Sequence, residues 1–132
     1  MARIWFSLGA LSALLALVAA SLSFHALQVE ANVREQIVLD IANDIHLFNS
    51  LAFICIGLIT RVYGPVLLVQ VAGGVLVLGV LLFSGGIYIS AMMKIEMLRP
   101  FIPVGGVAMF AGWALLAITP LMLGSPGSGR AG

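Results

Sequence analysis

The stretch FIPVGGVAMFAGWALL, residues 101–116, decides the fold. It carries no charge, as a membrane-spanning helix should, yet it holds one proline and three glycines, which weaken helices in water. Lipid tails are as apolar as leucine, so helices in a membrane associate through close packing, which small residues allow. Gly105, Ala108 and Gly112 lie within about 60° of one another around the helix, so we expect one narrow groove that accepts a neighbouring helix. Pro103 falls in the first turn, where its missing N–H removes no hydrogen bond.

The whole chain is too apolar for a water-soluble fold. Of its 132 residues, 62% are hydrophobic and 8% are charged, against an apolar share of roughly 45–50% in soluble domains. A bilayer crossing needs about 20 mostly apolar residues, and we place four spans at about residues 4–27, 46–63, 65–93 and 101–123. We therefore predict an all-α fold, a four-helix transmembrane bundle with antiparallel up-down topology. It forms a single integral membrane domain over residues 1–123, and residues 124–132 form a flexible tail.

An amphipathic helix is predicted over residues 32–45, between the first and second spans. Asn32 and Glu35 form the pattern of a capping box, in which each side chain satisfies a free backbone amide of the other. Apolar residues then recur at three- and four-residue steps on one face: Val33, Ile37, Ile41, Ile45 and Phe48. We expect this helix to rest in the membrane interface and to run into the second span, with its apolar face buried against the bundle. A binding surface for a partner is the alternative.

The first span has features of a signal peptide as well. Residues 1–23, MARIWFSLGALSALLALVAASLS, have a basic start, an apolar body and a small-residue tail, and cleavage after Ala20 is conceivable. The apolar run continues through Phe24 and Leu27, however, and so exceeds the usual apolar core of about 7–15 residues. We therefore expect this segment to be retained as a spanning helix.

Short links make consecutive helices antiparallel neighbours. Gly64 suits the left-handed position that ends the second helix, and Pro65 suits the first turn of the third. Residues 94–100 form a similarly short link to the fourth helix.

Small residues also line faces of two other spans. In the third span, Ala72, Gly79 and Gly86 are evenly spaced and Ser90 follows on the same face, a spacing typical of a left-handed helix crossing. The first span has a stripe of its own, made of Gly9, Ser12, Ala16, Ala19 and Ser23. We assign helix packing above all to Gly79, Gly86, Gly105, Ala108 and Gly112.

Charge says little about partners or orientation. The net charge is +1 and no basic cluster occurs along the chain, so neither nucleic acid nor an anionic lipid surface is indicated as a partner. With the N-terminus inside, each membrane face carries three basic residues, but all five acids fall outside and Arg3 adjoins the first helix. We therefore predict that both termini are cytoplasmic. The one cysteine, Cys55, lies in the middle of the second apolar run and is expected to be a small core residue.

Three motifs carry a resemblance to a known family. Residues 83–88 read FSGGIY, residues 103–106 read PVGG and residues 111–113 read AGW. They resemble the small membrane family typified by YgdD, catalogued as domain of unknown function 423 and related to the animal transmembrane protein 256. His25 matches the histidine that ends the family's first helix, whereas Asn49 stands where the family has a second histidine. The resemblance implies a four-helix integral membrane protein of bacterial or mitochondrial type, and it implies no activity. Of these two locations we expect the bacterial inner membrane.

A polar cluster is predicted near one membrane face. In an alternating bundle, the end of the first helix, the start of the second and the late part of the third share a face. This brings together His25, Asp44, His46, Asn49, Ser84 and Tyr88. Ser84 and Tyr88 are one turn apart, so both can point toward the histidines or Asn49. The cluster either binds a small ligand, a lipid headgroup or a metal, or only fixes the helix register. Because the two histidines lack tight ligand spacing, we expect no metal and no cofactor.

Sequence signatures of catalysis are absent. The glycine pairs 73/74, 85/86 and 105/106 lie within or at the start of spans, so none belongs to a phosphate loop or dinucleotide fingerprint. No acid, lysine or arginine lies deep in a span, which disfavours ion-coupled transport. We expect a non-enzymatic structural or accessory component that packs, as a homo-oligomer or in a larger membrane complex, through its small-residue faces. The alternative is a transporter or channel subunit that uses the polar cluster.

Overall fold

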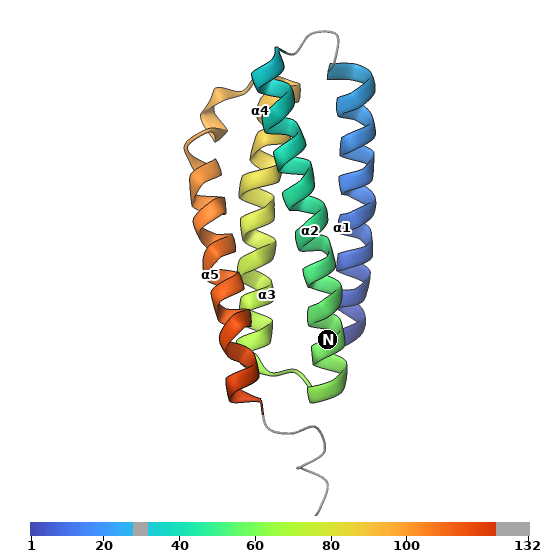
Figure 1. Cartoon of the computed structure of the whole chain (residues 1–132), viewed down its shortest axis with the longest axis vertical. Helices are drawn as coiled ribbons and strands as arrows, with labels where there is room; N and C mark the ends of the chain where they lie inside the picture. Colours follow the sequence, from blue (N-terminus) through green and yellow to red (C-terminus); the bar gives the residue numbers. More distant parts are fainter. Residues whose placement is uncertain (28–31, 124–132) are drawn as a thin grey trace, which may run out of the picture.

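The computed structural model describes residues 1–27 and 32–123, which are almost entirely helical (Figure 1). The elements are α1 (Ala2–Leu22), the π-helical turn η1 (Ser23–Leu27), α2 (Val33–Tyr63), α3 (Leu67–Val80), the π-helical turn η2 (Leu81–Gly85), α4 (Gly86–Met93), the 3-10 turn η3 (Glu96–Leu98) and α5 (Phe101–Met122). α3, η2 and α4 join into one rod, so four helical segments are long and apolar enough to cross a membrane. The described residues contain no strand. The predicted all-α, four-helix fold is confirmed.

The four long helices stand roughly side by side along the long axis of the molecule (Figure 1). α1 packs on α2, and α5 packs on α3 and η2, while α2 meets α3 and α4 between these two pairs. α1 and α5 therefore form the flanks, and only 17% of the most apolar window of each is buried, against 39% for α2 and for the α3–α4 rod. The start of α1 and the end of α5 lie at the same end of the bundle.

The capping box predicted at the start of α2 is confirmed. Glu35 N donates to Asn32 Oδ1 at 3.0 Å, and Asn32 N donates to Glu35 Oε2 at 3.3 Å. From there α2 runs without a break to Tyr63, so the amphipathic segment and the second span are one helix. The position of its first turns in the membrane interface remains a prediction.

The expectation that the apolar face of this segment is buried against the bundle is wrong. Leu39 and Ala42 are buried there and pack with Ile87 of α4. Lipid solvates apolar side chains as well as a protein core does, so the fit between helices decides which face turns inward. The predicted apolar face points outward, with its first three residues exposed: Val33, Ile37 and Ile41.

The link between α2 and α3 contains a glycine at the end of α2, as predicted, but its proline precedes α3 and does not lie in the first turn of that helix. Gly64 ends α2 with φ +84° and ψ −178°, a conformation that is essentially restricted to glycine. The prediction for Pro65 is wrong, because α3 begins at Leu67 with Val66 as its N-cap. A residue before proline is driven to extended ψ, so the chain passes straight through Gly64 and turns into the helix only after Pro65.

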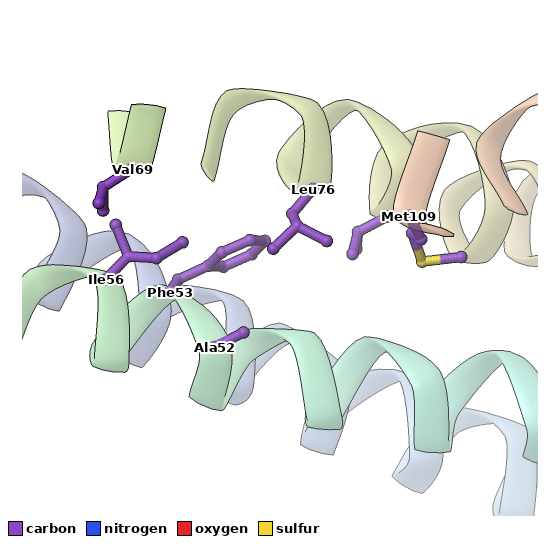
Figure 2. Close-up of a cluster of buried hydrophobic side chains, with 7 residues drawn as sticks. Ala52, Phe53, Ile56, Val69, Leu76 and Met109 are labelled. Atoms are coloured by element: carbon purple, nitrogen blue, oxygen red, sulfur yellow. The ribbon is translucent and has the colours of Figure 1, made fainter. Parts of the chain in front are cut away.

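A line of buried apolar side chains fills the space between α2 and α3. Phe53 and Ile56 of α2 point toward Val69 and Leu76 of α3 (Figure 2). The complete cluster is Ala52, Phe53, Ile56, Val69, Leu76, Val80 and Met109, the last contributed by α5. The half-buried Trp5 and Leu8 of α1 also pack against this cluster, so the core joins the central pair of helices to both flanks.

Glycines bring the backbones of α5 and the α3–η2 rod into contact. A Cβ on Gly105 would lie 2.5 Å from Phe83 N and 2.8 Å from Gly79 O, so no side chain fits there. A Cβ on Gly79 would lie 2.5 Å from Met109 Cγ and 3.0 Å from Gly105 O. The two glycines thus face each other across the seam.

The same seam continues above and below this contact. Gly112 lies against Leu76, whose Cγ would be 2.6 Å from an added Cβ, and Gly86 lies against Ile102, at 3.1 Å from Cγ1. Ala108 is half-buried at the edge, whereas Met109 is buried and fills the space that Gly79 leaves. The packed face of α5 is therefore a groove lined by glycines, from which one large side chain, that of Met109, projects toward the α3–η2 rod.

Candidate functional site: a polar network inside the bundle

Five polar side chains from α1, α2 and α4 form a continuous hydrogen-bonded network, which we call the polar network: Ser12, Asn43, His46, Ser50 and Tyr88. Ser12 Oγ lies 3.1 Å from His46 Nε2 and 2.7 Å from Ser50 Oγ. On its other side, His46 Nδ1 lies 3.4 Å from the Tyr88 hydroxyl, which also lies 3.4 Å from Asn43 Oδ1. One imidazole therefore links three helices.

The donors in this network can be assigned by counting protons. Ser50 donates to the His46 carbonyl at 2.8 Å, so its oxygen accepts from Ser12. Ser12 has then used its only proton, and it must accept from His46 Nε2–H. This leaves Nδ1 as an acceptor for the Tyr88 hydroxyl. With a neutral imidazole carrying its proton on Nε2, the single Tyr88 proton goes either to Nδ1 or to Asn43 Oδ1, so only one of these two contacts is a hydrogen bond at a time.

His46 lies deeper in the bundle than expected. Its partner Ser12 is at the middle of α1, whereas the sequence suggested that His46 starts the second span near the headgroups. α2 begins at Val33, so about 20 Å of helix precedes His46 at 1.5 Å per residue. A titratable side chain at the depth of a span centre is a default candidate for function.

Asn49 ties α2 to α5 separately from the polar network. It is 2% exposed, and its Nδ2 donates to Ile45 O at 2.8 Å and approaches Met109 Sδ at 3.6 Å. Its Oδ1 accepts from Trp113 Nε1 at 3.2 Å. The Trp113 ring also lies against Phe48, with 5.3 Å between ring centroids.

The remaining members of the predicted cluster do not join the network. Ser84 is buried in η2 and donates to Ala42 O at 2.8 Å, not to a histidine or to Asn49. His25 is exposed beside the ring of Phe24 and borders a separate hollow, and Asp44 is exposed. The convergence of all six residues on one site is therefore wrong in detail: only His46 and Tyr88 are bonded to each other.

The sequence contains a pattern that could have predicted part of the polar network. Asn43, His46 and Ser50 stand three and four residues apart, so they share one face of α2. Ser12 could not be found this way, because it comes from another helix. Among the described residues, no group of three His, Cys, Asp or Glu side chains could hold a metal.

A second set of hydrogen bonds lies toward the N-terminal end of the bundle. Trp5 Nε1 donates to Gln70 Oε1 at 2.6 Å, and Gln70 Nε2 donates to Thr60 Oγ1 at 2.8 Å. The Trp5 indole crosses from α1 to α3 and lies on Gly73, which has no side chain to block it. The polar side chains of these spans thus serve to join helices.

Comparison with known proteins relates the chain to one group of membrane proteins. The profile of the family described as protein of unknown function (DUF423) matches residues 15–106. The chain is 29% identical over 119 residues to the UPF0382 membrane protein SERP0230 of Staphylococcus epidermidis, covering 90% of this chain and 96% of that protein. It is 31% identical over 117 residues to the UPF0382 membrane protein SH2409 of Staphylococcus haemolyticus, covering 89% and 94%. A 48-residue match to the UPF0382 inner membrane protein YgdD of Escherichia coli is 42% identical and covers 36% and 37%. No solved structure matches the chain.

Proposed function

The chain belongs to the DUF423 family, to which its motifs pointed, and on that premise we propose that it is a non-enzymatic accessory component of the bacterial inner membrane. It docks a helix of another membrane protein, or of a second copy, in an open groove between α2 and α5. Both termini lie in the cytoplasm. The inner membrane is the location stated in the name of the Escherichia coli relative.

The polar network supports a role without catalysis. Ser12 and His46 form a hydrogen-bonded pair, but the residue behind the imidazole is Tyr88 and not an acid. Neither Ser12 nor His46 lines any of the three prominent hollows among the described residues.

The observation that carries the proposal is an apolar groove of about 490 Å³, the α2–α5 groove. Its walls include Phe48, Leu51 and Cys55 of α2, and Trp113 and Pro120 of α5. Cys55 is exposed there, so its expected place in the core is wrong. The hydrogen bond from Trp113 to Asn49 holds the walls together, which makes the groove a preformed feature of the chain.

The groove replaces the small-residue faces as the docking surface. Gly79, Gly105 and Gly112 already face helices of the same chain, so they cannot also receive a partner. Rigid aromatic side chains at the groove rim, Phe48 and Trp113, are of the kind that anchor protein interfaces. A helix seated there would cover Leu51, which is 55% exposed.

Photo-crosslinking in intact bacterial membranes tests this proposal. A benzophenone amino acid in place of Leu51 should give one discrete protein adduct, to a second copy or to another membrane protein. The matched position is Leu14 on the outer face of α1, which is 56% exposed and should give no protein adduct. Filling the groove with Cys55→Trp should abolish the adduct, whereas Leu17→Trp on α1, at a side chain that is 59% exposed, should keep it. Equal crosslinking from Leu51 and Leu14, or an adduct that survives Cys55→Trp, contradicts the proposal.

A second candidate, a proton-conducting or transport subunit, is favoured by the depth of His46. A neutral imidazole bonded to hydroxyl groups on both sides can pass a proton along such a chain. Proteoliposomes with a trapped pH dye should then acidify faster than protein-free liposomes, and His46→Gln should remove the difference while His25→Gln keeps it. Equal acidification with and without the protein rules this candidate out.

A further inference from the structure

A hollow at the end of the bundle opposite the N-terminus brings together charged residues that are far apart in sequence. It has a volume of about 820 Å³ and lies where α2 begins, α4 ends and α5 begins (Figure 1). We call it the basic cavity; its polar lining is Asn32, Arg34, Glu35, Ser90, Lys94, Glu96 and Arg99.

Among the described residues, the cavity lining holds three basic and two acidic side chains, a net charge of +1. Glu35 accepts a hydrogen bond from the Asn32 backbone in the capping box, and Glu96 pairs with Arg99 at 3.4 Å. Within the described parts of the chain, Arg34 and Lys94 have no acidic partner. The basic side chains of the cavity come from separate segments of the chain. They therefore form no cluster along the sequence, although they lie together in the folded structure.

The floor of the cavity is apolar and holds one unsatisfied polar atom. Val38, Leu39, Ile87 and Ile102 line it. Ser90 lines it as well, and its Oγ is buried without a hydrogen-bond partner in the described structure. A buried hydroxyl without a partner costs free energy. Because this oxygen is covered by protein atoms, an acceptor atom of a ligand reaches it only after the Ser90 side chain rotates toward the cavity.

Lys94 is held in an unusual backbone conformation. Its φ of 53° and ψ of 32° place it in the left-handed region, where helix C-caps favour glycine or asparagine. Among the described residues it is the one non-glycine position with positive φ. A lysine at this position keeps an ammonium group at the cavity that glycine could not supply.

We propose that the basic cavity binds the headgroup of an anionic phospholipid. Arg34 and Lys94 contact the phosphate, the Ser90 hydroxyl donates to a headgroup or ester oxygen, and the apolar floor receives the glycerol and the start of an acyl chain. Charge-assisted bonds from arginine and lysine are the usual means of holding phosphate. A lipid is favoured over a free anion because a soluble phosphate would leave the apolar floor empty.

Native mass spectrometry of the full chain in mild detergent tests this proposal. Dioleoyl phosphatidylglycerol and dioleoyl phosphatidylcholine share their acyl chains, so any difference in binding reports the headgroup. Each basic residue near a membrane surface contributes about 1 kcal/mol toward an anionic lipid, so we expect a preference of about tenfold or more for phosphatidylglycerol. Arg34→Gln with Lys94→Gln should remove the preference, and Arg3→Gln with Arg61→Gln at the other end should keep it.

Three results would overturn the proposal. These are equal binding of the two lipids, an unchanged preference in the Arg34→Gln, Lys94→Gln variant, or full displacement of the lipid by glycerol phosphate at the same concentration. The last would identify a soluble anion as the ligand. Both residues are exposed, so the variant should keep its helical circular dichroism. If it does not, the single variants replace it, each with a loss of about fivefold.

Discussion

At the scale of single residues, each adjacent pair of glycines has one packed and one open member. Gly73 lies under Trp5, Gly86 against Ile102 and Gly105 against Phe83. An added Cβ would meet nothing within 4 Å at Gly74 or Gly85, and only the Phe83 ring, at 3.8 Å, at Gly106. The neighbours in each pair therefore provide a matched control of the same residue type at almost the same depth.

Gly73→Ala should displace the Trp5 indole. The new Cβ would overlap ring carbons of Trp5, and moving the ring lengthens its hydrogen bond to Gln70. We expect a loss of about 1–3 kcal/mol in the free energy of unfolding, as for other overpacked sites. Unfolding in mixed micelles, followed by tryptophan fluorescence in a Trp113→Phe background, measures it. Gly74→Ala should stay within about 0.5 kcal/mol of the parent; matching losses at both positions would contradict the assignment.

At the scale of helices, the connection between α2 and α3 depends on backbone conformation and not on contact. An added Cβ on Gly64 would meet nothing within 4 Å, yet its φ and ψ suit glycine alone. We expect Gly64→Ala to cost about 1–3 kcal/mol through backbone strain. Thermal unfolding in detergent, compared with Gly74→Ala, gives the measurement. Unchanged stability would mean that the hairpin can turn in another way.

The coupling free energy of the side-chain hydrogen bond between α2 and α5 can be measured by a double-mutant cycle. Asn49→Leu and Trp113→Phe each remove the hydrogen bond between Asn49 and Trp113. We expect the combined variant to be more stable than additivity predicts, by about 0.6 kcal/mol and at most about 1.7 kcal/mol, as for other hydrogen bonds between membrane helices. Strict additivity would show that the two side chains do not interact in the folded state.

At the scale of the whole molecule, the fold could be predicted because apolar length and composition nearly determine it. Four long apolar runs mark the helices, and a capping box at Asn32 and a glycine at position 64 mark the two ends of α2. The depth of His46 could not be read in the same way. No residue between Val33 and His46 interrupts the helix, so α2 begins several turns before the position in the sequence where hydropathy rises.

The candidate site was predicted only in part, because its members meet through tertiary packing. His46 and Tyr88 were identified, but Ser12 belongs to a packing stripe and its hydroxyl has no sequence signature of function. The basic cavity could not be predicted from the sequence for the same reason, since Arg34 and Lys94 are separated by two spans. Patterns along one helix are visible in a sequence, whereas contacts between helices of different depth and rotation are not.

The central claim is that glycine lets α5 touch the backbone of the α3–η2 rod. Gly105→Ala and Gly106→Ala, unfolded reversibly in mixed micelles, test it most directly because the two sites differ in contact and not in residue type. Gly105→Ala should lose about 2 kcal/mol or more, since backbone atoms of Phe83 and Gly79 stand in the way. Gly106→Ala should change the stability by less than about 0.5 kcal/mol. Equal stability of the two variants would contradict the account.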